Sequence, residues 1–132
     1  EINRALNRVG RILYNVKADY LLLFFYNPDC HACKEITGQL LSSPLISGLQ
    51  TNKKLKILAV YPDEDLEAWR KHIPDVPAEW INSYDNTVSL KNDEIYDLKA
   101  IPTLYLLDKN KKVILKDVTL NQLMEFLQMQ TN

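Results

Sequence analysis

The two cysteines of this 132-residue chain lie three positions apart, and two thiols at this spacing can exchange a disulfide with another molecule. Cys30 and Cys33 enclose His31 and Ala32. On a helix, residues i and i+3 share one face at a separation of about 5–6 Å, which a disulfide can bridge. We therefore predict that this pair alternates between a dithiol and a disulfide.

The two thiols are expected to have different roles, because an apolar run at residues 20–26 ends shortly before Cys30. A buried strand followed by turn residues at 27–29 places Cys30 at the start of a helix. Unpaired backbone N–H groups and the positive end of the helix dipole stabilise a thiolate there. We predict that Cys30 forms a mixed disulfide with a partner and that Cys33, one turn further along, resolves it.

The composition is typical of one globular domain, residues 1–132, and argues against several kinds of partner. Hydrophobic residues make up 46% of the chain and charged residues 25%. A net charge of −1 argues against a nucleic-acid partner. No apolar stretch approaches the roughly 20 residues of a membrane helix. Because residue 1 is Glu rather than Met, we expect that a preceding segment was removed. The sequence neither requires nor excludes an export signal or a membrane tether in that segment.

Apolar patterns predict the elements that hold the cysteine pair. The first residues have helical spacing up to Val16, although residues 11–16 also suit an edge strand. Residues 74–89 show no clear period and are expected to form a loop with aromatic anchors. The expected strands cover residues 20–26, 55–61, 103–107 and 113–118, and the expected helices cover residues 30–41, 44–49, 62–73, 93–98 and the stretch from 120 onward.

This order of elements predicts an α/β fold with one mixed sheet and helices on both faces. Short connections and right-handed crossovers make the first two strands parallel, and residues 108–112 join the last two as an antiparallel hairpin. Tyr61, Trp69, Trp80 and Tyr84 are expected to form a small core rather than a binding surface. If part of this aromatic group were exposed near the cysteines, it would influence the choice of partner.

The pattern resembles the thioredoxin fold, with its buried strand, its C-x-x-C opening a helix, and an Ile-Pro-Thr at residues 101–103 before the hairpin. Residues 13–17, the insertion between residues 62 and 100, and the strand and turn at 106–113 resemble the TlpA/ResA-like branch. That branch comprises exported bacterial thiol–disulfide oxidoreductases. The resemblance implies a periplasmic or otherwise exported monomer that reduces protein disulfides and is recharged by a further redox partner, with no cofactor.

The resemblance also implies a cis peptide bond before Pro102, lying against the cysteine pair. Pro102 has no N–H, so the backbone of Ile101 would be free to pair with an extended substrate segment. The local sequence alone favours a trans bond, because only about 5–6% of bonds before proline are cis. A proline at the start of an edge strand is the alternative interpretation.

The surroundings of the dithiol depart from familiar thioredoxin. Asp29 occupies the place of the usual Trp, and residues 31–32 replace Gly-Pro. Phe24 stands at the position where thioredoxin has a buried acid that accepts a proton. Some TlpA/ResA-like proteins keep an acid after the following strand, and Glu64 is the best match, although it also suits the start of a helix.

Other interpretations of the cysteine pair fit the chain less well. A zinc site would need further ligands from His31, His72 or carboxylates, whose spacing is unsuitable, so no metal is expected. Peroxidases of this fold usually have Thr or Ser and an Arg around the cysteine, and copper chaperones prefer C-x-x-x-C. The remaining alternative is a non-catalytic interaction or redox-sensing module of a larger exported protein.

The charges beside Cys30 oppose one another and predict an intermediate reduction potential. His31 would stabilise the thiolate as a donor or cation, whereas Asp29 would destabilise it by repulsion. One unit of thiol pKa corresponds to about 30 mV for a two-electron couple. We expect a potential between those of thioredoxin and DsbA, roughly −270 to −120 mV, measured against glutathione. A value outside this interval would contradict the proposed balance of charges.

Overall fold

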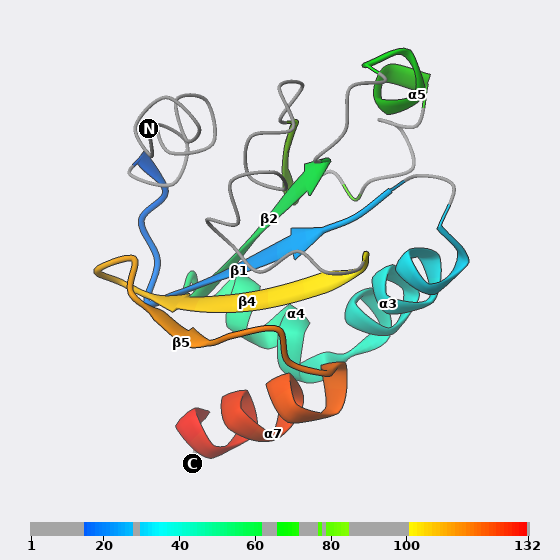
Figure 1. Cartoon of the computed structure of the whole chain (residues 1–132). Coiled ribbons are helices and arrows are strands. Elements are labelled where there is room, and N and C mark those ends of the chain that lie inside the picture. The colour runs from blue at the N-terminus through cyan, green and yellow to red at the C-terminus, as the bar shows by residue number, and fades with distance from the viewer. Residues whose placement is uncertain are drawn as a thin grey trace.

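The computed structural model describes residues 15–27, 30–61, 66–71, 77, 79–84 and 101–131 (Figure 1). The helix or strand expected before residue 15 and the short helix expected at residues 93–98 lie outside the described residues.

The described strands form one five-stranded mixed sheet in the order β3-β2-β1-β4-β5. β1 is parallel to β2, which is parallel to β3, whereas β4 is antiparallel to both β1 and β5. The predicted mixed α/β sheet, with a parallel first pair and a final antiparallel hairpin, is therefore confirmed. The strands are β1 (Tyr20–Phe25), β2 (Leu55–Tyr61), β3 (Ile81–Tyr84), β4 (Thr103–Asp108) and β5 (Val113–Leu115).

The central strand β1 is buried on both faces. Leu22 and Phe24 belong to a core that includes side chains of α3 (His31–Ser42), whereas Leu23 and Phe25 belong to a second core on the opposite face. All four side chains are at most 1% exposed. A strand covered on both sides has no polar face, so its sequence is a continuous apolar run rather than an alternating one.

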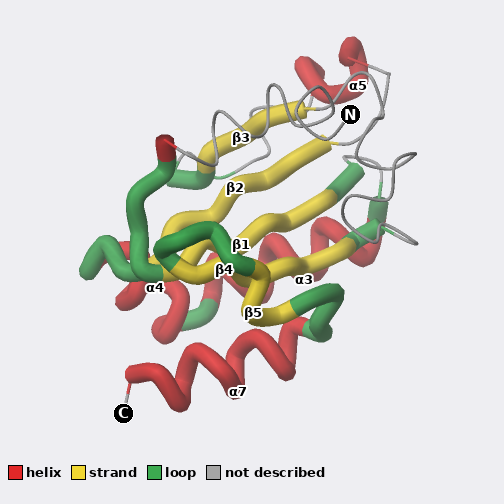
Figure 2. Tube along the Cα trace, turned by 60° about the vertical axis from the view of Figure 1, so that its left-hand side comes forward, coloured by secondary structure: helices red, strands yellow, loops and turns green. Residues whose placement is uncertain are grey.

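Three helices cover the same face of the sheet, as Figures 1 and 2 show: α3, α4 (Pro44–Thr51) and α7 (Leu120–Thr131). A fourth, α5 (Leu66–Lys71), lies at the opposite end of the molecule from α7 (Figures 1 and 2). Proline is favoured in the first turn of a helix, where its missing N–H has no partner to lose. The separate helices expected at residues 30–41 and 44–49 are confirmed, since α3 ends at Ser42 and α4 begins at Pro44.

Part of the stretch expected to be a loop is a strand. Residues 81–84 form β3, in which Ile81 pairs with Leu58 of β2. The prediction of a loop over residues 74–89 was wrong here, because four residues are too few to show a period and the pairing partner comes from a distant part of the chain. The last strand is also shorter than the predicted 113–118, since β5 ends at Leu115.

A substitution in β1 should measure how much the central strand stabilises the fold. Leu22 is fully buried, so Leu22→Ala should lower the free energy of unfolding of the reduced protein by about 3 kcal/mol. Val113 is 43% exposed on the edge strand, so Val113→Ala should change it by less than about 1 kcal/mol. Urea denaturation followed by circular dichroism measures both, and equal losses would contradict the placement of Leu22.

Candidate active site

Cys30 is the N-cap residue of α3, as expected for the first cysteine. Its N–H donates to the carbonyl of Asn27 at 3.0 Å, and its own carbonyl accepts from the N–H of Lys34 at 3.2 Å. The Cys30 Sγ accepts a hydrogen bond from the backbone N–H of Cys33 at 3.1 Å. The sulfur therefore takes the place of the side-chain oxygen that usually caps a helix and occupies its electropositive end.

The second cysteine lies one turn inside the helix and is buried. Cys33 is 3% exposed, whereas Cys30 is half-buried, and both are free thiols. Burial, and then the hydrogen bond with the Cys30 side chain, raise the pKa of the Cys33 thiol to about 12, although the backbone of Asn27 acts in the opposite direction. Cys33 is therefore protonated at neutral pH, and Cys30 is the thiol that a partner can reach.

The sheet register brings Pro102 to the same end of the sheet as the cysteines. Phe25, the last residue of β1, pairs with Thr103, the first residue of β4. The residues just before β4 therefore lie beside those just after β1. Pro102 and Ala32, which lies between the cysteines, line one groove. The bond between Ile101 and Pro102 is cis, as the resemblance implied.

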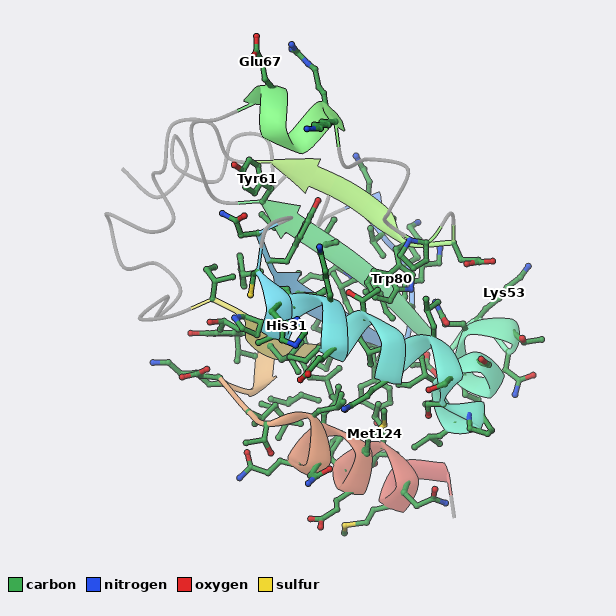
Figure 3. All side chains as sticks on the ribbon, turned by 90° about the vertical axis from the view of Figure 1, so that its right-hand side faces the viewer. His31, Lys53, Tyr61, Glu67, Trp80 and Met124 are labelled. Atoms are coloured by element: carbon green, nitrogen blue, oxygen red, sulfur yellow. The ribbon has the colours of Figure 1, made fainter. Side chains whose placement is uncertain are left out.

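His31 points away from the core and contacts an acid of its own helix. Its side chain is 87% exposed, and its Nε2 lies 3.1 Å from the Oε1 of Glu35. Figure 3 shows His31 on the first turn of α3. The other two residues expected to tune the dithiol, Asp29 and Glu64, lie outside the described residues, as does His72.

The core below the cysteines is apolar where thioredoxin has an acid. Phe24 is 1% exposed and belongs to the same core as Cys33. Among the described residues, Thr103 is the one buried polar side chain. Nothing in the sequence pattern indicated Thr103 beyond its place after Pro102, because its burial depends on the position of β4 between β1 and β5.

The aromatic residues that the structure describes form a core, as predicted. Trp80 is 7% exposed and Tyr61 is 2% exposed. The rings of Phe24 and Trp80 meet edge to face with centroids 6.0 Å apart, and Tyr26 packs against Tyr61 at 6.2 Å. The side chains at positions 69 and 84 are not among those described.

Two acidic residues of the groove were not identified from the sequence. Glu35 and Asp117 both line it, from α3 and from the segment before α7. The i,i+4 spacing of His31 and Glu35 could have indicated the first. Asp117 lies far along the chain and has no comparable signal.

Neither metal ligands nor a membrane span are found in the part of the chain that the structure describes. No three His, Cys, Asp or Glu residues are grouped there in a way that could hold a metal ion. No helix among the described residues has the length and apolar character needed to cross a bilayer.

Comparison with known proteins places this geometry in a family. A family model described as thioredoxin-like matches residues 18–113. No curated protein matches the chain significantly. A thioredoxin-like protein from Bacteroides caccae ATCC 43185 is 54% identical, with a TM-score of 0.83 over 89% of this chain and 42% of its own. The chain thus spans less than half of that protein.

Two further solved structures are similar over most of both chains. The C-terminal domain of an uncharacterized protein from Bacteroides fragilis NCTC 9343 is 53% identical, with a TM-score of 0.83 over 88% of this chain and 83% of its own. A thiol–disulfide oxidoreductase from the same organism is 25% identical, with a TM-score of 0.69 over 86% and 82%. This chain therefore belongs to the thioredoxin-like family.

Proposed function

We propose that this chain is a thiol–disulfide oxidoreductase that reduces protein disulfides through Cys30 and Cys33. The observation that carries the proposal is the asymmetry of the pair, with Cys30 half-buried at the N-terminus of α3 and Cys33 buried one turn further in. An accessible sulfur at a helix N-terminus suits a nucleophile, and a buried thiol that hydrogen-bonds to it suits a resolving group. The similarity to a thiol–disulfide oxidoreductase from Bacteroides fragilis supports the same chemistry.

The reaction has two exchange steps. The Cys30 thiolate attacks one sulfur of a substrate disulfide, so a bond from Cys30 to that sulfur forms, the substrate bond breaks, and the other substrate sulfur leaves as a thiolate that takes a proton from solvent. Cys33 then releases its proton to solvent and attacks the Cys30 sulfur, which expels the second substrate thiolate. Two electrons have passed to the substrate, and the Cys30–Cys33 disulfide remains. A dithiol donor reverses these steps and restores the reduced pair.

The neighbouring residues have supporting roles in this proposal. Ile101 offers its backbone to an extended substrate segment, because Pro102 beside it leaves no N–H to compete. Asp29, His31 and Glu64 tune the dithiol through their charges. The compartment is periplasmic or otherwise exported, where disulfides persist and a reductase has substrates.

A non-catalytic module is the second candidate, and one observation favours it. The chain corresponds to less than half of the Bacteroides caccae protein, so the domain could serve as a sensing or docking part of a longer polypeptide. The two candidates differ in whether Cys30 turns over a disulfide substrate.

Single-cysteine variants should separate the two roles. Cys33→Ala keeps the nucleophile but cannot resolve, so it should accumulate a mixed disulfide with insulin, visible on non-reducing gels and by mass spectrometry. Cys30→Ala is the matched control and should trap nothing. With dithiothreitol as donor, the wild type should reduce insulin, and both variants should fall to the uncatalysed background. A wild type without activity would favour the non-catalytic module.

The resolving step should be slow at neutral pH and should accelerate as the pH rises. In the mixed disulfide Cys30 carries no charge, but burial, the larger cause of the raised pKa of Cys33, remains. Because the thiolate is the nucleophile, the rate of resolution should increase about tenfold per pH unit between pH 6 and 9. Rapid-quench measurement of the second substrate thiol checks this, and a flat profile would contradict it. Glu64→Gln is the companion variant. It should leave the resolution rate nearly unchanged if the proton passes directly to solvent, whereas slower resolution at fixed pH would identify Glu64 as the proton acceptor.

A further inference from the structure

We propose that the groove beside the dithiol selects substrate segments that carry a lysine or arginine close to the reactive cysteine. This rests on the proposed function and adds the class of substrate. The groove has a volume of about 440 Å³ and runs between α3, the residues around Pro102 and the segment before α7. In Figure 3, α7 runs beneath α3, and His31 on the first turn of α3 lies at the reactive end.

The floor of the groove is apolar. It is formed mainly by Ile36 of α3, Pro102, and Val118 and Leu120 on the opposite wall, all of which are half-buried. Such a floor accepts an apolar side chain or the aliphatic stem of a lysine, because both lose contact with water there. It does not by itself distinguish one peptide from another.

The two walls of the groove each carry a carboxylate. Glu35 is 61% exposed, and its Oε1 lies 3.1 Å from Nε2 of His31, which orients it toward the cysteine end of α3. Asp117 is exposed in a left-handed conformation (φ 50°) and has no ion-pair partner among the described residues. A positively charged side chain between these walls would therefore meet negative charge on both sides.

The nearby positive groups do not cancel this charge. Lys34 and Lys116 are exposed neighbours in the sequence, but neither lines the groove. The N-terminus of α7 is capped, since Thr119 Oγ1 accepts from the N–H of Gln122 and the Gln122 side chain accepts from the N–H of Thr119. His31 contacts Glu35 and offsets its charge only when the imidazole is protonated. A helix end is equivalent to about half a positive charge, so the carboxylates of Glu35 and Asp117 still leave the groove net negative.

A substrate segment with a basic residue beside its cysteine therefore fits both the charge and the position of the groove. An extended segment pairing with Ile101 would bring its cysteine to Cys30 and its neighbouring side chains over the groove. A lysine or arginine there would gain from both carboxylates, and an aspartate or glutamate would be repelled. The preference should weaken in salt, because the carboxylates are exposed to solvent.

Three model peptides test the preference. Each holds one cysteine as a mixed disulfide with 2-mercaptoethanol, and its flanking positions carry Lys, Ser or Glu. The second-order rate constant for reduction by the reduced protein is divided by that for dithiothreitol, which removes the intrinsic reactivity of each peptide. For the wild type we expect the Lys peptide to react about tenfold faster than the Glu peptide at low salt, and about twofold faster in 0.5 M NaCl.

Two double variants locate the effect. Glu35→Gln/Asp117→Asn retains side-chain size, and Asn tolerates the left-handed backbone, so the ratio should fall to about twofold or less. Asp19→Asn/Glu125→Gln changes the net charge by the same amount at exposed positions outside the groove, and it should keep the wild-type ratio. A wild type that reduces all three peptides equally, or a groove variant that keeps the ratio, overturns the charge selection. A wild type that reduces none of them overturns the proposed function instead.

Discussion

The burial of β1 on both faces is the constraint on which the rest of the site depends. Because neither face of this strand can meet water, its position is set by two cores, and its last residue marks a fixed point at the end of the sheet. The first turn of α3 follows within a few residues. The Cys30 sulfur caps this helix through the N–H of Cys33, so the proposed nucleophile and the helix end are one structural unit.

The same packing makes the two thiols unequal. Cys33 belongs to the core that holds Phe24 and the helices α3, α4 and α7, and burial opposes its ionisation. Thioredoxin places an acid where this chain has Phe24. Phe24 cannot accept a proton and instead packs in the core that includes Cys33. In the proposed mechanism, the proton of Cys33 must therefore leave to solvent or to a group outside the described core.

The groove beside the dithiol is assembled from three parts of the chain that are distant in sequence. The antiparallel pairing of β4 with β1 brings Pro102 to the cysteines, and the chain after β5 adds the wall that carries Asp117. The fold is shared with relatives from Bacteroides. If the proposed function holds, we expect differences in substrate choice within the family to arise from the residues that line this groove.

Local chemistry sufficed to predict the strands β1, β2 and β4, the helices α3 and α4, and the positions of the two cysteines, because each depends on a continuous apolar run, a turn or a cap. It did not suffice for β3, which exists because β2 offers a partner edge. Nor could it reveal Glu35 and Asp117 as opposite walls of one groove. The sequence by itself determined which residues can perform disulfide chemistry and which run must be buried. Tertiary structure alone decided which side chains line the groove beside the dithiol, since strand pairing joins segments whose separation along the chain leaves no local pattern.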